Sequence, residues 1–281
     1  MCRIKFTLLH CGSTLMSPTL PYGNGDYLFS NGFAVAERNK IWLPASAYLV
    51  EHPNGRILID TGWSRTVSPT AEGYCRQGIN RVFPINSLMS YEGRVDRRKS
   101  VDEQLADQGI RPSDIDYVLL THMGPDRVSG LERVADARRI LVSETEYKAA
   151  NRFGSRLLRY QPKMWDDAPM YTFTFDKTGR GPVGNSYDLY GDGSVQLVHL
   201  PGFTRGMTAV VIKSGKKFIL VYSDAGFGKQ AWRKMLLPGI CVDRKLAYRS
   251  LMWVRQMSLS PDCVASLANH DPEEIPRTMV I

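Results

Sequence analysis

Two stretches of the chain place a short polar turn between hydrophobic, strand-like runs. In residues 48–60 the turn contains Asn54-Gly55, and in residues 210–222 it contains Ser214-Gly215. Glycine adopts the positive φ angles that tight turns need, so this pattern is typical of β-hairpins. The sequence therefore predicts two hairpins, one in each half of the chain.

Helix signals alternate with these strands. Ser100 and Glu103 form a capping box for a helix that Gly109 ends, and Ser143 and Glu146 repeat the box. Near the C-terminus, a spacing of three or four residues predicts one hydrophobic helical face, made of Leu246, Ala247, Leu251, Val254 and Met257.

The order of these elements indicates the fold class. Strands paired mostly by hairpins and covered by helices predict a mixed α/β arrangement with two packed sheets. Residues 63–99 follow neither the helix nor the strand period, and we expect a long loop, lid or insertion there. We expect residues 1–281 to form a single domain.

Composition agrees with an ordinary globular protein, since 43% of the 281 residues are hydrophobic and 23% are charged. No apolar run approaches the ~20 residues that span a bilayer, which argues against a membrane protein. Residues 1–9 are too short an apolar stretch for a signal peptide. The five cysteines are scattered, without a Cys-x-x-Cys pair, as in reduced compartments. We therefore expect a cytoplasmic protein.

The net charge of +8 comes from basic residues spread along the chain. Nucleic-acid binders more often carry a continuous basic helix or an aromatic-studded strand, so we expect no nucleic-acid partner. Solvated surface explains most of these charges. Attraction of an anionic small molecule or an acidic partner stays open.

The most informative motif follows the strand-like run Tyr117–Leu120. The next residues have the frame of a His-x-His-x-Asp-His cluster, but residues 122–127 read His-x-Gly-x-Asp-Arg. A dinuclear zinc site needs several imidazoles and carboxylates that converge from loops after strands. Further loops of this kind comprise residues 59–62, 200–207, 222–227 and 268–271.

These motifs, with the opening His10-Cys11-Gly12, resemble the metallo-β-lactamase superfamily and, within it, the N-acyl homoserine lactonase-like branch. They occur in the family's order from residue 4 to about residue 275. The resemblance implies a four-layer αββα sandwich, an α+β fold of metallo-β-lactamase type. It also implies descent from enzymes that hydrolyse lactones with two metal ions.

The resemblance carries the family's functional residues over only in part. The retained positions are His122, Asp126, Asp224 and His270. The replaced positions are Gly124, Arg127 and Phe203, where the family has histidines, and Phe227, where the lactonases have a catalytic tyrosine.

Arg127 changes the expected chemistry most. A guanidinium is permanently charged and has no lone pair for a metal, but it can pair with carboxylates. We therefore expect Arg127 to pair with Asp126 and Asp224 in place of the metals, and we expect no cofactor. The alternative is one Zn, Mn or Fe ion held by Asp126, Asp224 and His270.

Three functions follow as hypotheses. In the first, a metal-independent hydrolase acts on a small ester or lactone, Arg127 polarises a carbonyl or holds an anionic group, and His122 or His270 is the general base. In the second, a non-catalytic relative binds a ligand or a partner. In the third, a mononuclear metallohydrolase activates water. We expect a small-molecule pocket walled by Trp63, Phe203, Met207 and Phe227; a homodimer stays open.

Overall fold

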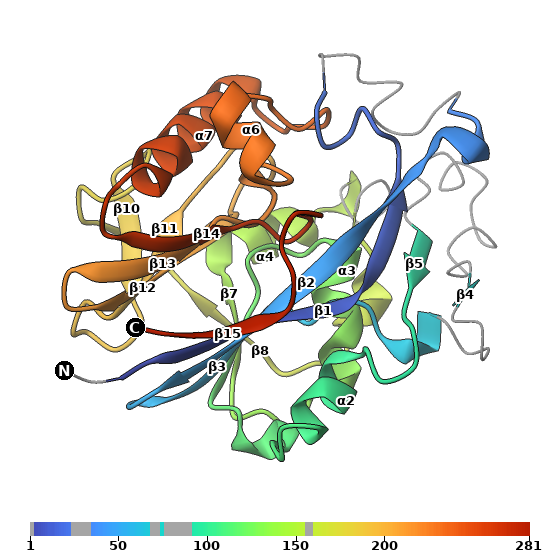
Figure 1. Cartoon of the computed structure of the whole chain (residues 1–281), viewed down its shortest axis with the longest axis horizontal. Helices are drawn as coiled ribbons and strands as arrows, with labels where there is room; N and C mark the ends of the chain where they lie inside the picture. The colour runs from blue at the N-terminus through green and yellow to red at the C-terminus, as the bar shows by residue number, and fades with distance from the viewer. Residues whose placement is uncertain (1–2, 24–34, 68–73, 76–91, 155–159) are drawn as a thin grey trace.

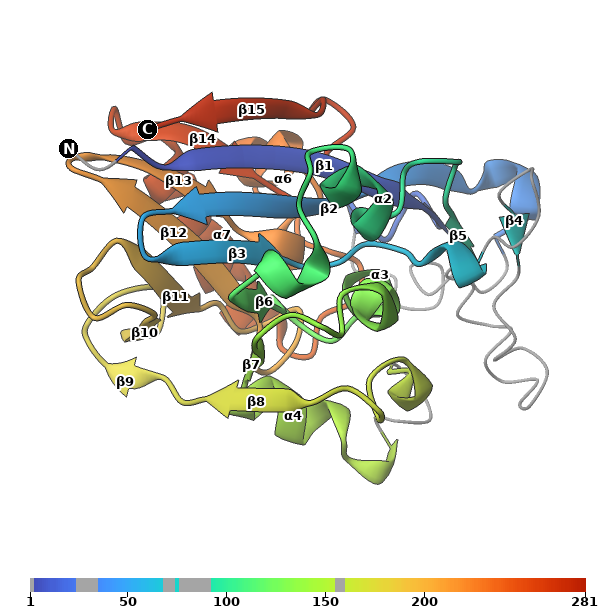
Figure 2. The ribbon, with the colours of Figure 1, turned by 90° about the horizontal axis from the view of Figure 1, so that it is seen from below.

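The computed structural model describes residues 3–23, 35–67, 74–75, 92–154 and 160–281. Within these residues, two β-sheets pack face to face and helices cover both outer faces (Figure 1). The four layers are the αββα sandwich that the sequence motifs predict. Seen from below, strands β15, β1, β2 and β3 lie side by side, and α6 and α7 lie behind them (Figure 2).

The first sheet has the strand order β4-β5-β1-β2-β3-β6-β7-β8, with β15 beside β1. Its strands are β1 (Lys5–Met16), β2 (Ile41–His52), β3 (Gly55–Ile59), β4 (Tyr74–Cys75), β5 (Glu92–Arg94), β6 (Tyr117–Leu119), β7 (Ile140–Ser143), β8 (Met170–Phe173) and β15 (Arg277–Val280). Strands β3, β6, β7 and β8 run parallel to one another.

The second sheet has the order β14-β13-β12-β11-β10-β9. Its strands are β9 (Asp176–Lys177), β10 (Asn185–Asp188), β11 (Val195–His199), β12 (Thr208–Ser214), β13 (Lys217–Val221) and β14 (Cys263–Leu267). Neighbours are antiparallel except for β13 and β14, which are parallel.

The α-helices form the two outer layers. They are α2 (Val101–Ala106), α3 (Pro125–Val128) and α4 (Glu144–Ala150) on the first sheet, and α6 (Lys229–Lys234) and α7 (Arg244–Ser258) on the second. Short 3-10 helices are η1 (Glu37–Asn39), η2 (Arg65–Val67), η5 (Pro112–Asp114), η6 (Ser129–Arg133), η7 (Pro162–Met164) and η8 (Ser223–Ala225). No described helix has the length and apolar character that a membrane crossing requires.

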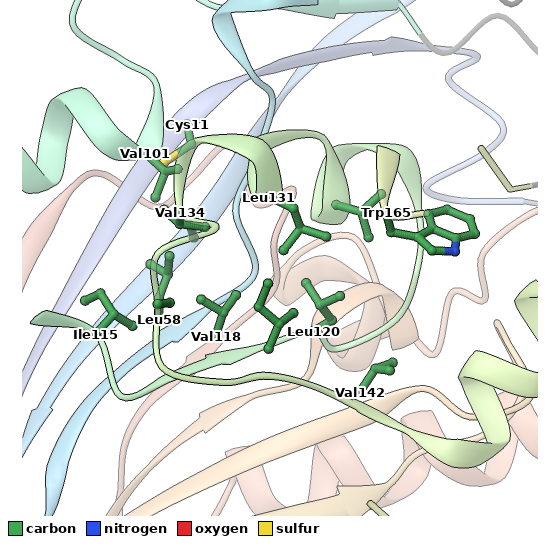
Figure 3. Packing of buried hydrophobic residues seen from close by; sticks show 14 of the residues in the cluster. Cys11, Leu58, Val101, Ile115, Val118, Leu120, Leu131, Val134, Val142 and Trp165 are labelled. Carbon is green, nitrogen blue, oxygen red and sulfur yellow. The ribbon is translucent and has the colours of Figure 1, made fainter. Parts of the chain in front are cut away.

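Alternation along the strands divides the core into layers. Successive side chains of a strand point to opposite faces of the sheet. In β3, Ile57 and Ile59 pack between the two sheets, whereas Leu58 faces the first helical layer. Figure 3 shows Leu58 in this outer layer, together with Val118 and Leu131. Burial on both faces explains why the central strands read as nearly continuous hydrophobic runs.

Both predicted hairpins are confirmed. Strands β2 and β3 pair through a turn in which Gly55 has a φ of +140°. Strands β12 and β13 pair in the same way, with Gly215 at +60°. The capping box at Ser100 and the N-cap at Ser143 are also present.

The prediction that hairpins dominate the pairing was wrong for one half of the first sheet. Strands β6, β7 and β8 pair in parallel, and the helices α3 and α4, which lie between them in the chain, cover the outer face of the sheet. The predicted lid at residues 63–99 falls largely outside the described residues. Its described residues include η2, β4 and β5, and β5 pairs with β1, which the sequence pattern did not predict.

Candidate active site

The predicted site residues follow the carboxyl ends of two pairs of parallel strands. Asp60 follows β3, and His122 to Arg127 follow β6, its parallel neighbour. Asp224 follows β13, and His270 follows β14, again a parallel pair. Parallel strands end at the same edge of a sheet, so the fold brings these loops together at one place.

Arg127 lies at the centre of the cluster and is completely buried. Its Nη2 atom donates to Asp224 Oδ1 at 2.6 Å and lies 2.8 Å from His270 Nε2. Its Nη1 atom lies 3.4 Å from Asp126 Oδ2. A buried guanidinium thus contacts two carboxylates and one imidazole, a geometry that charge-assisted hydrogen bonds favour.

The hydrogen bonds of His270 orient its ring. His270 Nδ1 lies 2.7 Å from the carbonyl oxygen of Pro44 and must donate to it, because a carbonyl oxygen only accepts. In the neutral ring the lone pair is therefore on Nε2, which accepts from Arg127 Nη2. The arginine uses the same lone pair that a metal ion would use.

Asp126 is a buried carboxylate of the cluster whose pKa its neighbours lower. Burial alone would raise the pKa of Asp126, but the positive charge of Arg127 holds it well below its usual range. His270 Nε2 lies 3.1 Å from Asp126 Oδ2, and Thr14 Oγ1 donates to the same oxygen at 3.1 Å. The aspartate is therefore ionised at neutral pH.

Two of the expected pocket residues lie elsewhere. Trp63 is fully buried in a small cluster with Ala45 and Val67, and its Nε1 donates to Thr14 Oγ1 at 2.9 Å. It thus contacts Asp126 through Thr14 and is not among the residues that line the cavity at the cluster. Met207 packs in the core beneath α7. Hydrophobicity could not distinguish a pocket wall from the core at these positions.

His122 is buried beside Asp224. Its Nε2 lies 3.4 Å from Asp224 Oδ2, and its Nδ1 lies 3.3 Å from Ser223 Oγ. Burial, reinforced by the charge of Arg127, lowers the pKa of His122 to about 4 although Asp224 opposes this shift. The imidazole is therefore neutral at physiological pH.

Asp60 belongs to the same charge cluster, although the sequence analysis gave its loop, residues 59–62, only as one of the family motifs and assigned the side chain no role. It is fully buried, accepts from Thr121 N at 2.8 Å and from Asn269 Nδ2 at 2.7 Å, and lies 3.7 Å from Arg127 Nε. Burial raises the pKa of Asp60 to about 7 against the opposing charge of Arg127. An aspartate that directly follows a hydrophobic strand was the available signal.

Aromatic rings close the cluster. Phe227 stacks on His270 with ring centroids 4.9 Å apart, and Phe203 meets both His122 and Phe227 edge-on, at 5.5 and 6.0 Å. The cavity that remains has a volume of about 20 Å³. Its walls are His122, Gly124, Pro125, Asp126, Phe203, Asp224, Phe227 and His270. A cavity of this size holds about one water molecule, which is far less than an ester or lactone needs.

The absence of a side chain at Gly124 is one reason why the cavity is so small. A Cβ atom at position 124 would lie 2.7 Å from His122 Nε2, closer than such atoms approach. The His122 ring therefore occupies the space that a side chain at position 124 would need. The His122 ring can lie where it does only because residue 124 is a glycine.

A four-layer sandwich with aspartates and histidines at one sheet edge defines the class of metallo-β-lactamase-type proteins. Residues 41–266 match the sequence profile of the metallo-beta-lactamase superfamily, and the chain belongs to this superfamily. Its similar relatives include the N-acyl homoserine lactonase AttM of Rhizobium radiobacter, which is 25% identical over 82% of this chain and 83% of that protein. A probable metallo-hydrolase of Mycobacterium tuberculosis is 27% identical over 69% of this chain and 59% of its own length.

Solved structures of lactonases share the fold. An N-acyl homoserine lactone hydrolase with N-hexanoyl-L-homoserine at its catalytic metal centre is 19% identical, covers 96% of this chain and 94% of its own, and gives a TM-score of 0.71. AidC, a dizinc quorum-quenching lactonase, is 17% identical over 99% of this chain and 94% of its own, with a TM-score of 0.62.

The donor set does not fit a dinuclear zinc centre of this family. Gly124 and Phe203 offer no ligand atom, and Arg127 lies within hydrogen-bond distance of Asp224 and His270. A zinc ion bound to those two side chains at ~2.0–2.2 Å would overlap the guanidinium. Among the described residues, no group of three or more His, Cys, Asp or Glu side chains is arranged to hold a metal ion.

Proposed function

We propose that this chain is a lactonase-like protein whose metal centre has become a structural ion-pair cluster, and that it binds a small anionic ligand without hydrolysing it. The observation that carries the proposal is the position of Arg127 Nη2, 2.6 Å from Asp224 Oδ1 and 2.8 Å from His270 Nε2. The positive charge of Arg127 then balances the negative charges of Asp126 and Asp224, which metal ions would balance in a metal-bound site.

Three features support a non-catalytic role. Arg127 is engaged with its neighbours and has no access to a substrate carbonyl, because its side chain is completely buried. Phe227 lacks the hydroxyl that the lactonases carry at this position. The cavity of about 20 Å³ leaves no room for a lactone ring between Phe203 and His270. The family's two-metal hydrolysis has neither the donors nor the space here.

Metal content and turnover test the proposal together. Protein purified from zinc-supplemented cells is analysed for zinc, manganese and iron, and ring opening of N-hexanoyl-homoserine lactone is followed by acid release. A curated lactonase relative serves as the positive control. We expect far less than one metal per chain and no ring opening above background, with or without added zinc. One equivalent of metal with chelator-sensitive turnover would contradict the proposal and support the mononuclear alternative.

One observation favours a metal-independent hydrolase as the second candidate. His122 lines the cavity as a neutral imidazole beside Asp224, which is the state a general base requires. Turnover of an ester panel that survives chelator and disappears in His122→Gln would establish this candidate instead. Turnover that His122→Gln leaves unchanged would exclude His122 as the base.

A further inference from the structure

A second, larger cavity lies on the other side of the loop that carries Phe203. It is a groove of about 560 Å³ between α4, the loop of residues 201–205 and the start of α7. Phe203 points into the small cavity described above, whereas its neighbours Gly202 and Thr204 line the groove. Ligand pockets for small molecules typically have volumes of ~300–1,000 Å³, so the groove has the size that the family's site lacks here.

The floor of the groove is apolar and its rim is cationic. Ala149, Val183 and Leu246 contribute apolar surface. Arg152 and Arg205 are exposed at the rim, and neither has an ion-pair partner among the residues that the structure describes. A ligand with an apolar part and an anionic group would complement both features.

The two acidic residues of the groove are already engaged. Glu144 pairs with Lys148 one helical turn later, at 2.7 Å. Asp243 is the N-cap of α7, and its side chain accepts from Leu246 N at 2.9 Å. Neither carboxylate neutralises Arg152 or Arg205, so the positive charge at the rim is available to a ligand.

The surroundings reinforce this charge. The first six residues of α7 include Arg244, Lys245 and Arg249 and no acidic residue. The N-terminus of α7 also borders the groove, where the Asp243 carboxylate caps it. The wall also holds Thr204, which is fully buried and whose Oγ1 has no hydrogen-bond partner in the described structure. The charges of Arg152 and Arg205, which no described carboxylate pairs, attract ligands of the opposite sign.

We propose that this groove is a binding site for a small amphipathic anion, namely a carboxylate that carries a short acyl chain. Arg152 and Arg205 bind the carboxylate, and the acyl chain lies on Ala149, Val183 and Leu246. The site is separate from the Arg127 cluster. It therefore does not depend on whether that cluster binds metal, and it would account for the ligand of the proposed function.

Binding of octanoate to the full chain tests the proposal. Calorimetric titration gives affinity and stoichiometry, and methyl NMR shifts of Val183 and Leu246 report the location. We expect saturable binding with one octanoate per chain, and at least tenfold weaker binding in the Arg152→Gln/Arg205→Gln variant. The control Arg111→Gln removes an exposed arginine outside the groove and should bind as the wild type does.

The remaining comparisons decide the ligand class. Octanol, which has the same chain without charge, and inorganic phosphate, which has charge without a chain, should each bind at least tenfold more weakly than octanoate. If either probe bound as tightly as octanoate, the proposal that the ligand is an amphipathic anion would be wrong.

A Thr145→Trp variant tests the location of the site. It fills the groove from an exposed position of α4 and should abolish octanoate binding without changing the unfolding midpoint. If both Arg152→Gln/Arg205→Gln and Thr145→Trp bound octanoate with the affinity of the wild type, the proposal that this groove is the binding site would be wrong.

Discussion

At the residue scale, Arg127 is the substitution on which the site depends. Its guanidinium contacts Asp224, Asp126 and His270, and Asp60 lies within 3.7 Å of its Nε. Desolvating a charge is costly unless partners surround it, and here three carboxylates do so. The residue therefore has a structural role that the sequence motif alone did not establish.

Truncation of Arg127 should destabilise the fold strongly. Arg127→Met leaves Asp126 and Asp224 buried without their cation, so we expect a loss of about 3–5 kcal/mol in the free energy of unfolding measured with urea. Arg111 makes a matched control, because it pairs with Asp114 at the surface, and Arg111→Met should have no measurable effect. Equal losses in the two variants would show that Arg127 does not compensate buried charge.

Asp60 should give the stability a pH dependence of defined sign. Its folded pKa of about 7 lies above its ordinary value of 3.8, so its protonation stabilises the fold at low pH and this contribution is lost as the pH rises to about 7. The free energy of unfolding of the wild type, minus that of Asp60→Asn, should therefore become less positive or more negative from pH 4 to pH 7. A value that stays constant or rises in urea unfolding series would contradict the raised pKa.

His122 should give the stability a pH dependence of the opposite sign, so that its contribution grows as the pH rises. Its folded pKa of about 4 lies below the ordinary value of 6.5, so the unfolded chain binds more protons between these values. The wild type should gain stability relative to His122→Gln as the pH rises from about 4 to about 6.5. The same unfolding series measures both variants, and slopes of equal sign would refute the assignment.

At the element scale, local signals predicted local structure well. The Asn54-Gly55 turn, the capping box of Ser100 and the buried face of α7 depend on neighbours in sequence, and each is present. The pairing of β5 with β1 depends on a contact between distant segments, which no local pattern encodes. The same holds for Trp63, whose hydrophobicity fits a pocket wall and a core equally well.

The loop between β11 and β12 is held by close backbone contact with α7. Gly202 has a φ of +136°, and a Cβ there would lie 2.2 Å from Ala247 N. Gly109 also has a positive φ, +71°, but a Cβ there meets nothing within 4 Å.

Substituting alanine at Gly109 and at Gly202 should separate the cost of a strained backbone φ from the cost of steric overlap with α7. Gly109→Ala should cost about 1–2 kcal/mol, the strain of a left-handed residue. Gly202→Ala should cost at least ~2 kcal/mol more, because α7 must move away. Thermal unfolding of the two variants measures the difference, and equal costs would contradict the close contact.

At the scale of the whole molecule, the order of motifs predicted the αββα sandwich, since strand-end loops in a fixed order define where the site forms. The sequence also shows that Gly124 and Phe203, at two positions of the family motifs, offer no ligand atom. It could not predict that Phe203 and Phe227 reduce the cavity to about 20 Å³, because ring positions depend on tertiary packing. The separate groove beside α7 likewise arises from elements distant in sequence.

A protein that folds around metals loses stability when a chelator removes them, because ligands that bind only the native state stabilise it. We propose that the Arg127 cluster takes that role here. We therefore expect the unfolding midpoint to be the same with chelator, with added zinc and with neither. A midpoint that rises with zinc concentration in scanning calorimetry would show a native-state metal site.

The most direct test is the anomalous diffraction of crystals grown with zinc, recorded at the zinc absorption edge. Our account predicts no anomalous peak between Asp126 and Asp224, and guanidinium density of Arg127 within hydrogen-bond distance of Asp224 and His270. An anomalous peak coordinated by Asp126, Asp224 and His270, with Arg127 turned away from them, would contradict it.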